Sequence, residues 1–551
     1  MMYIRFAILL LTSVLLLPVA TNAQDAISRM KDHVYFLAAD SLEGRLTGTP
    51  GEAIAFRYIS EQYEDIGLEP LGDNYLQAFD FTFQRQVDPS TMVMIDGEII
   101  GKNDYYPLSY SGNVTMKGKL KHAGYGIEAP ENNYNDYADL DPSDHILVIE
   151  VSSPDGKHPH SKYLAHLDLT TKIEKAKEKG AAGVIFVNTD PNCEDPSDNL
   201  DTKIKPYQNL PILFVKDKSL LPDGAHASIT IRINEDVRTG HNVIGWINNE
   251  APNTVVIGAH YDHLGYGVSG SLYTGDEPAI HNGADDNASG VAVIMELARF
   301  LKDNETLANN NYLLIAFSGE ELGLYGSNYF VKNPMIDLDQ INYMVNLDMG
   351  ARLDEEGNLA INGVGTSPTI TEVVESIKVE GVKVSTSSSG IGPSDHTSFY
   401  LKDIPVVHFF TGTHEDYHRP SDDAELINYT GLGLVYNYLQ SFIEQLNDDG
   451  HLEFTPTKDD NNKNAPRFTV SLGVIPDYLY DGKGMRIEGV RDGRPADKAG
   501  IEDGDIVIQM GPVPVVDMMS YMKGLSQFKK GDTTTVVVQR GEEEKSFEVT
   551  F

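Results

Sequence analysis

Cysteine is almost absent from this sequence. Cys193 is the single cysteine among 551 residues. One cysteine excludes an internal disulfide framework and any cysteine-rich metal cluster. A metal ion would therefore have to be held by histidine, aspartate and glutamate side chains.

Positive charge is also scarce. Lys and Arg total 43 against 82 Asp and Glu, which gives a formal net charge of −39 at pH 7. A chain this acidic repels phosphate backbones and anionic membrane surfaces. We therefore exclude nucleic acid as a partner, and we attribute the acidic excess to solubility.

Long apolar runs are missing apart from one at the N-terminus. The mostly apolar stretch 6–17 follows Arg5 and precedes Thr21-Asn22-Ala23, which offers small residues for cleavage before Gln24. The run is too short to span a bilayer comfortably. We expect residues 1–23 to be a signal peptide and the mature protein to be exported, to the periplasm or beyond, without membrane insertion. An uncleaved N-terminal anchor is the alternative.

The length predicts about three or four domains. Helical periodicity runs from residue 26 to 67, and short Gly-separated strands fill most of 95–235. A helix near Thr171, opened by a capping box with Glu174, interrupts these strands. Residues 451–465 are polar and typical of a linker, and 466–551 is long enough for one small β-rich domain.

Residues 240–450 have an alternating α/β pattern. Helices are predicted over 290–302 and 431–446. Near-continuous apolar runs are typical of strands covered on both faces, and they occur at Thr254–Gly258, Tyr312–Phe317, Tyr343–Leu347 and Pro405–Phe410. The predicted fold class is α/β: a mostly parallel mixed sheet flanked by helices, with a β-rich inserted domain and a small C-terminal β-rich domain.

Ionisable residues follow the ends of these runs, where ligands gather in open α/β sheets. They are His260-Tyr261-Asp262-His263, Asp285-Asp286 before the helix 290–302, Glu320-Glu321, Asp348, and His414 with His418. Isolated pairs of this kind are usually solvated, but five such elements at five strand or helix ends indicate one site.

Two histidines with several carboxylates suit zinc. The positive charge of two divalent ions is balanced by the negative charge of three carboxylates and a hydroxide. A dinuclear centre also needs one carboxylate that spans both ions. An Asp in the tight Gly-Ala-Asp-Asp turn suits that task. Of the adjacent Glu320 and Glu321, one can ligate while the other acts as a base.

The segment His414-Glu415-Asp416-Tyr417-His418 also matches H-E-x-x-H, which binds one zinc ion when it lies on a helix. Here Gly412 and Pro420 flank the motif and leave little room for a continuous helix. A loop that delivers His418 alone is the preferred interpretation.

The stretches GAHYDHLG, NGADDNASG, FSGEELGLYGS, NLDMG, SDHTSF and YHRPSDD occur in this order. Together they resemble the di-zinc aminopeptidase family that includes glutamate carboxypeptidase and glutaminyl cyclases. The resemblance implies two zinc ions, and it assigns the following residues: His260 and Asp348 on one ion, Glu321 and His418 on the other, Asp285 bridging both, Glu320 as general base and Asp262 orienting His260. It also implies a cis peptide bond directly after the bridging aspartate, between Asp285 and Asp286.

The implied reaction is hydrolysis of N-terminal residues from peptides with free N-termini, by a water between the ions. Tyr417 is a candidate donor to the oxyanion, or else a packing residue. Residues 24–90 are similar to the family's N-terminal segment, 95–235 to a protease-associated insert and 466–551 to a PDZ domain. The PDZ-like part could bind a peptide C-terminus at Leu472-Gly473-Val474.

Two other functions stay open at this stage. A carboxypeptidase of the same family would need a basic pocket, for which Arg352 and Arg419 are candidates. A peptide-binding protein with an inactive peptidase fold is the other alternative. The complete ligand set argues against it, because clustered buried carboxylates without metal repel one another.

Overall fold

The computed structural model describes residues 25–158, 161–202, 204–275, 277–457, 470–476, 483–490, 494–502, 504–515, 518–525, 527–529, 531–541 and 543–551. The predicted signal peptide lies outside the described residues, as does most of the predicted linker. Among the described residues, no helix has the length and apolar character needed to cross a membrane.

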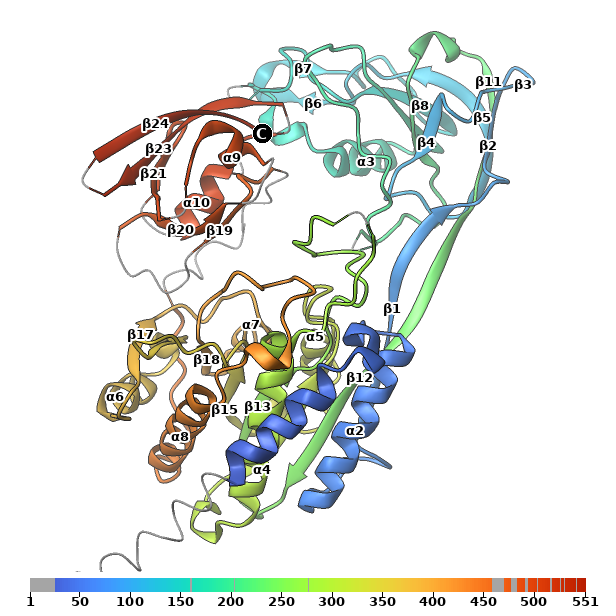
Figure 1. Cartoon of the computed structure of the whole chain (residues 1–551). Coiled ribbons are helices and arrows are strands. Elements are labelled where there is room, and N and C mark those ends of the chain that lie inside the picture. Colours follow the sequence, from blue (N-terminus) through green and yellow to red (C-terminus); the bar gives the residue numbers. More distant parts are fainter. Residues whose placement is uncertain are drawn as a thin grey trace, which may run out of the picture. The chain divides into compact units, whose positions relative to one another are not determined.

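Two compact units divide the chain. Residues 80–238 form one unit, and 1–79 together with 239–551 form the other. The chain passes between the units twice, in strand β1 (Leu76–Val87) and strand β12 (Ile233–Ile247) (Figure 1). Each unit is described separately below.

The larger unit is built on an eight-stranded sheet with the order β1-β12-β14-β13-β15-β18-β16-β17. The central strands β14, β13, β15 and β18 are parallel, while β12 and β16 pair in antiparallel fashion with their neighbours. This confirms the predicted mixed, mostly parallel sheet. The remaining bounds are β13 Thr254–His260, β14 Asn311–Phe317, β15 Ile341–Leu347, β16 Asn358–Asn362, β17 Lys383–Ser387 and β18 Val406–Phe410.

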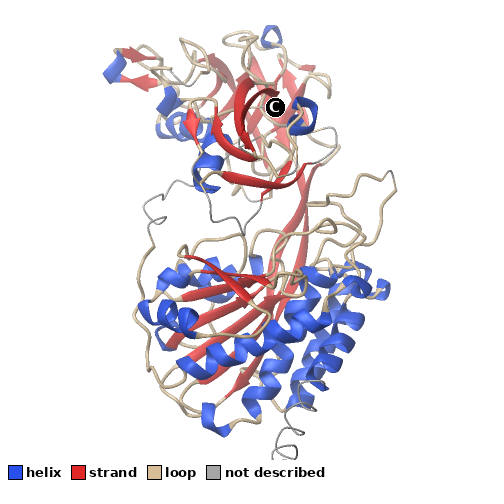
Figure 2. Ribbon diagram, turned by 60° about the vertical axis from the view of Figure 1, so that its left-hand side comes forward, coloured by secondary structure: helices blue, strands red, loops and turns tan. Residues whose placement is uncertain are grey.

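Helices cover both faces of this sheet (Figure 2). On β13, Val255 and Ile257 belong to one apolar core, and Val256 between them belongs to another. The first core also receives helix 25–37, α2 (Pro50–Ile66), α4 (Gly290–Lys302), α6 (Pro368–Ser376) and α8 (Tyr429–Leu446), whereas the second receives α5 (Tyr325–Lys332) and α7 (His396–Tyr400). Burial on both faces explains why the sequences of these strands are nearly continuous apolar runs.

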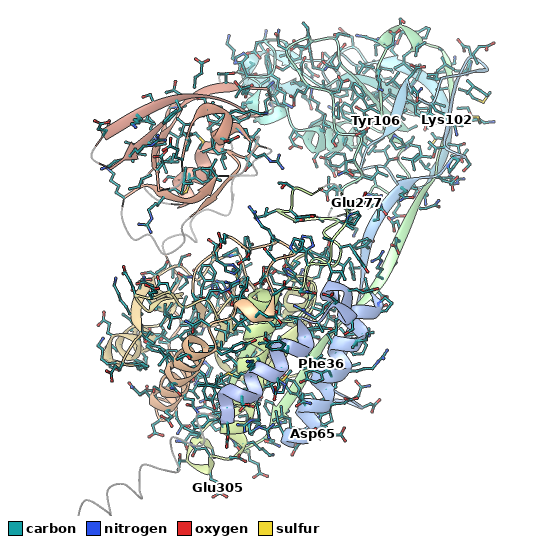
Figure 3. The ribbon with its side chains drawn as sticks, viewed as in Figure 1. Phe36, Asp65, Lys102, Tyr106, Glu277 and Glu305 are labelled. Atoms are coloured by element: carbon teal, nitrogen blue, oxygen red, sulfur yellow. The ribbon has the colours of Figure 1, made fainter. Side chains whose placement is uncertain are left out.

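Helix α2 shows how local sequence sets these elements. The hydroxyl of Thr49 accepts a hydrogen bond from the Glu52 N–H, Pro50 occupies the first turn, and Gly67 ends the helix at φ 85°. The apolar stripe between these caps faces the core. Acidic side chains such as Asp65 at the end of α2 and Glu305 lie at the surface, where water solvates their charge (Figure 3).

The unit 80–238 contains a second eight-stranded sheet, with the order β3-β2-β11-β5-β8-β9-β10-β4. Helix α3 (Leu169–Glu178) packs on it. The helix is capped by Asp168, whose carboxylate accepts the Thr170 N–H, so the predicted capping box at Thr171 is wrong. Strand bounds are β2 Met92–Ile95, β3 Glu98–Ile99, β4 Tyr105–Pro107, β5 Val114–His122, β8 His145–Glu150, β9 Gly183–Val187, β10 Ile212–Val215 and β11 His226–Ile231; the short pair β6 Glu128–Ala129 and β7 Tyr134–Asn135 is separate.

The C-terminal residues form a small β-rich fold around their own core, which includes Leu472, Ile487, Val507 and Val536. This confirms the predicted small β-rich C-terminal part. Its elements are β19 Val474–Pro476, β20 Met485–Val490, α9 Pro495–Ala499, β21 Ile506–Met510, β22 Val513–Pro514, α10 Met518–Leu525, β23 Thr533–Arg540 and β24 Glu543–Thr550.

A buried lysine forms hydrogen bonds to the backbone of several segments at one end of the second sheet. The Lys172 ammonium on α3 donates to the carbonyl oxygens of Tyr125 (2.9 Å), Glu150 (2.8 Å) and Ser152 (2.6 Å). Burial lowers the pKa of Lys172 from 10.5 to about 7. The folded unit therefore binds fewer protons than the unfolded chain between these pH values, and its stability rises with pH across that range.

Replacing this ammonium should destabilise the unit locally. We expect Lys172→Met to cost roughly 1.5–3 kcal/mol, because three buried carbonyls lose a charged donor. It should also flatten the rise in stability between pH 7 and 10.5. Hydrogen exchange followed by mass spectrometry checks this through faster exchange in peptides from 118–187. Lys177→Met, an exposed position on the same helix, is the control, and equal exchange in the two variants would contradict the role of Lys172.

Candidate metal centre

The ends of three parallel strands bring ionisable side chains to one edge of the main sheet. His260 is the last residue of β13 and pairs with Phe317 at the end of β14. Glu320 and Glu321 follow β14, and Asp348 follows β15. Because parallel strands end at the same edge, residues far apart in the sequence meet there.

Two histidine–carboxylate clusters share Asp286. Its Oδ1 lies 3.2 Å from His260 Nε2, and its Oδ2 lies 3.3 Å from His418 Nε2. His260 Nε2 also lies 3.2 Å from Asp348 Oδ1, and His418 Nε2 lies 3.2 Å from Glu321 Oε2. The two groups His260–Asp286–Asp348 and His263–Asp286–Glu321 each place their donor atoms within 4.8 Å of one another.

This geometry corrects the expected bridge. Asp286, not Asp285, has its two carboxylate oxygens on the two clusters. Asp285 is turned the other way: its Oδ1 accepts the Ala351 N–H at 2.7 Å, and its Oδ2 lies 3.2 Å from His414. The cis peptide bond is likewise Asp286–Asn287, one residue later than expected.

The turn that carries Asp286 is held from two sides. Asp422 Oδ2 accepts the backbone N–H groups of both Asp285 (2.9 Å) and Asp286 (3.0 Å). The Asn287 amide donates to the carbonyl of Leu347 and accepts from the N–H of Gly290. These contacts fix which of the two aspartates faces the histidines.

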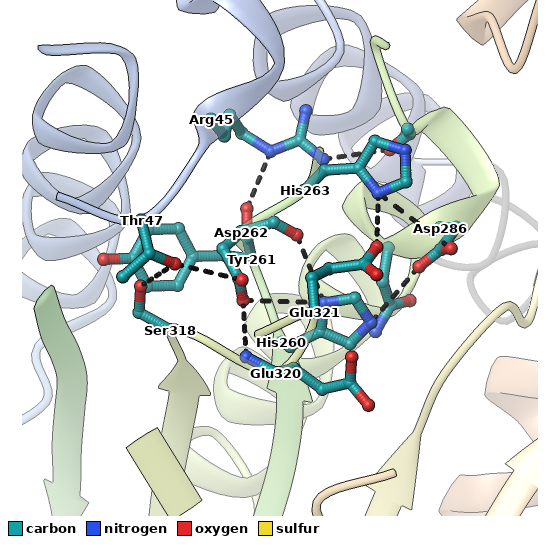
Figure 4. A network of polar contacts seen from close by, with 12 residues as sticks. Arg45, Thr47, His260, Tyr261, Asp262, His263, Asp286, Ser318, Glu320 and Glu321 are labelled. Carbon is teal, nitrogen blue, oxygen red and sulfur yellow. Dashed lines mark hydrogen bonds and ion pairs between the residues drawn. The ribbon is translucent and has the colours of Figure 1, made fainter. Parts of the chain in front are cut away.

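Asp262 connects the His260 side of the site to the helical N-terminal segment (Figure 4). Its Oδ1 accepts the Glu320 N–H at 3.2 Å, and its Oδ2 accepts the Thr47 hydroxyl at 3.0 Å. His260 Nδ1 lies 3.8 Å from the Asp262 carboxylate and 3.2 Å from its carbonyl oxygen. Asp262 thus contacts both the histidine and the backbone of the adjacent glutamate.

A buried arginine that the sequence reasoning did not single out lies under this loop. Arg45 is fully buried and donates to the carbonyls of Tyr261 (2.7 Å), Asn282 (2.6 Å) and Gly283 (3.0 Å). It thereby joins the loop after β13 to the turn that leads to Asp286. The sequence signal that could have found it is its place between Gly44 and Gly48, inside a segment of otherwise helical periodicity.

The close packing of carboxylates and imidazoles shifts the pKa values of several side chains in the site. Burial, opposed by the charge of His260, raises the pKa of Glu320 well above its ordinary value. Burial alone would raise the pKa of Glu321, but His418 and His263 lower it to about 2. Burial would likewise lower the pKa of His418, yet Glu321 and Asp286 raise it to about 11. The two adjacent glutamates are therefore biased toward opposite protonation states, and Figure 4 shows their carboxylates diverging.

The segment 414–420 consists of turns, so the two histidines of the H-E-x-x-H match do not share a helix. His414 lies beside Asp285 and His418 beside Asp286. Tyr417 stacks on the His418 ring with centroids 3.9 Å apart and packs against the apolar cluster of Met349 and Phe410. Glu415 is exposed.

Arg352 is paired within the protein. Its Nη2 lies 2.8 Å from Asp416 Oδ2 and 3.6 Å from Asp422 Oδ1. Two carboxylates thus balance one of the two guanidinium groups, those of Arg352 and Arg419, that the sequence offered for a basic pocket.

The donor set fits zinc. Imidazole nitrogens and carboxylate oxygens are its usual ligands in the absence of cysteine. A cluster of buried carboxylates also needs positive charge nearby, because like charges at this spacing repel one another strongly. The fold and the site thus define an α/β protein with a histidine–carboxylate centre at the sheet edge.

Comparison with known families gives the particular class. Residues 242–443 match Peptidase family M28, 108–221 match the PA domain and 454–551 match the PDZ domain. The chain therefore combines a peptidase family M28 domain with a PA domain and a C-terminal PDZ domain, as the sequence resemblance implied.

Similar proteins carry aminopeptidase names. The chain is 29% identical over 280 residues to aminopeptidase YwaD of Bacillus subtilis, covering 47% of this chain and 56% of that protein. It is 24% identical to the probable lipoprotein aminopeptidase LpqL of Mycobacterium tuberculosis, over 76% and 83% of the two chains. Against YwaD, the chain thus spans little more than half the length of its relative.

Among solved structures, an aminopeptidase from Aneurinibacillus sp. strain AM-1 is similar at 22% identity and a TM-score of 0.44. The match covers 78% of this chain and 95% of that one.

The two neighbouring aspartates should differ in metal binding. We expect Asp286→Asn to lower the zinc content per chain strongly, because its carboxylate is shared by both clusters. Asp285→Asn should keep the wild-type zinc content, since Asp285 faces Ala351 and His414. Zinc content after dialysis, measured by atomic emission, checks this. Loss of zinc in the Asp285 variant alone would restore the original assignment.

Proposed function

We propose that this protein is an exported zinc-dependent aminopeptidase that hydrolyses N-terminal residues from peptides. The observation that carries the proposal is the position of Asp286, whose two oxygens face two separate histidine–carboxylate clusters. This arrangement matches the requirement of a dinuclear centre for one spanning carboxylate.

The residues divide into two ligand groups. His260 and Asp348 would hold one zinc ion, Glu321 and His418 the other, and Asp286 would contact both. Bound zinc would supply the Lewis acidity that activates water and polarises the scissile carbonyl.

Glu320 is the proposed general base. It follows β14 beside His260, and the hydrogen bond from its N–H to Asp262 fixes its backbone. Its carboxylate accepts a proton from the attacking water and delivers it to the leaving amine nitrogen.

The aminopeptidase names of similar proteins support an N-terminal substrate over a C-terminal one. Arg352, one of the two arginines considered for a carboxylate pocket, is already paired with Asp416. A carboxypeptidase would need a free cationic group for the substrate carboxylate. Peptides with free N-termini are therefore the proposed substrates.

Export and the C-terminal domain complete the proposal. The apolar N-terminal run with its small residues before Gln24 supports export to the periplasm or beyond. The PDZ domain supports binding of a peptide C-terminus near Leu472-Gly473-Val474. We assign it an accessory role, because none of its described residues is among the donors of the metal centre.

Replacing the proposed base should stop turnover without removing metal. We expect Glu320→Gln to lower kcat by about 10²–10⁴-fold, the range typical of general base catalysis, with zinc content unchanged. Glu415→Gln is the matched control and should stay near wild-type activity, because Glu415 is exposed and belongs to neither cluster. The reverse pattern would establish the H-E-x-x-H interpretation.

A peptide mixture tests the activity itself. Each peptide is offered with a free and with an acetylated N-terminus, with and without a chelator, and products are identified by mass spectrometry. We expect stepwise, chelator-sensitive loss of residues from free N-termini only, because an aminopeptidase acts on the residue that carries the free ammonium group and needs its metal for turnover. Trimming from the C-terminus would establish a carboxypeptidase, and no cleavage with zinc present would favour cyclisation or peptide binding.

A further inference from the structure

Thr47 is completely buried in the turn before α2, far in the sequence from every residue of the metal centre. Its hydroxyl donates to Asp262 Oδ2 at 3.0 Å. An ionised carboxylate only accepts hydrogen bonds, so the single proton of this hydroxyl is directed at Asp262. Figure 4 shows the contact between the turn and the loop after β13.

The two oxygens of Asp262 have different surroundings. The carboxylate is completely buried and therefore needs donors from the protein. Its Oδ1 faces the metal centre, where it accepts the Glu320 N–H at 3.2 Å and lies 3.8 Å from His260 Nδ1. Its Oδ2 faces the other way, toward the Thr47 hydroxyl. Thr47 thus holds the carboxylate from the side opposite to the site.

A second buried acid holds Thr47 in turn. Glu52 Oε2 accepts the N–H of Gly48 at 2.7 Å, and its Oε1 accepts the Ser318 hydroxyl at 2.7 Å. Ser318 Oγ lies 3.2 Å from Thr47 Oγ1. The Thr47 methyl group packs against Gly240, where a Cβ atom would lie 2.8 Å from it. The direction of the Thr47 side chain is therefore set by its backbone, by Ser318 and by packing.

We infer that Thr47 is a positioning residue for the proposed hydrolysis. Its hydroxyl fixes the carboxylate of Asp262, and through it the ring of His260 and the backbone of Glu320. The inference rests on the proposed function and deepens it, because His260 and Glu320 are the proposed ligand and the proposed base. Partners behind a metal ligand set its direction, so Thr47 acts on metal affinity and turnover without touching substrate.

A purely structural role in the turn is the competing explanation. Thr49 in the same turn provides the comparison, because its hydroxyl donates to the Leu46 carbonyl at 2.6 Å and accepts the Glu52 N–H at 3.4 Å. Its side chain caps α2, and its described hydrogen bonds go to backbone groups of the same segment. Loss of the Thr49 hydroxyl therefore weakens this segment without reaching Asp262.

The test compares the full mature chain with its variants Thr47→Val, Thr47→Ser and Thr49→Val. Valine keeps the shape of threonine and removes the hydroxyl, whereas serine keeps the hydroxyl. The measurements are kcat and KM on a peptide that the wild type cleaves, the zinc retained against a chelator, and the melting temperature. Thr47→Ala removes the same hydroxyl with less apolar bulk, and it takes the place of Thr47→Val if that variant does not fold.

We expect Thr47→Val to lower kcat by about 10-fold or more at unchanged KM, and to lose zinc at a roughly 10-fold lower chelator concentration. Thr47→Ser should restore both values, because it still donates to Asp262. Thr49→Val should lower the melting temperature while kcat and zinc retention stay at the wild-type level.

Wild-type kcat and zinc retention in Thr47→Val would overturn the inference and leave the proposed function standing. An equal loss of kcat in Thr49→Val, or a Thr47→Ser variant as inactive as Thr47→Val, would also overturn it, because either result indicates general damage to the turn. A wild-type chain that neither binds zinc nor cleaves peptides would overturn the proposed function together with the inference.

Discussion

Repulsion among carboxylates is the constraint on which the rest of this structure depends. Asp286, Glu320, Glu321 and Asp348 converge at one sheet edge with little access to water, where like charges repel strongly. Imidazole rings lie between these carboxylates and supply hydrogen-bond donors and positive charge. The same crowding defines a place where divalent ions gain most, because they neutralise several carboxylates at once.

Hydrogen bonds from two buried charged side chains hold the backbone around these crowded groups in place. Asp422 accepts hydrogen bonds from two consecutive N–H groups of the turn before α4, and Arg45 donates hydrogen bonds to carbonyl oxygens of two loops. The Arg45 carbonyl also accepts the His263 N–H, and each of the two residues fixes backbone next to a proposed ligand. Buried charges in such positions are satisfied by backbone groups, so they stabilise one geometry of the loops.

The adjacent glutamates show how one loop places two residues of the same type in different electrostatic surroundings. Burial raises the pKa of Glu320, whereas His418 and His263 lower that of Glu321. These opposite tendencies distinguish the residue proposed as base from the residue proposed as ligand. The difference comes from which neighbours each side chain faces, because the two residues are chemically identical.

Much of this protein follows from its sequence alone. Apolar runs such as Thr254–Gly258 predicted buried strands, and their polar continuations predicted a site at one sheet edge, because parallel strands end together. The residue types at that edge also determined that a metal would be bound by nitrogen and oxygen. What only the tertiary structure decided is which neighbour faces which group: Asp286 rather than Asp285 lies between His260 and His418, and His263 lies beside Glu321. Adjacent residues of one turn look equivalent in sequence, and the direction of each side chain is set by distant partners such as Asp422 and Arg45.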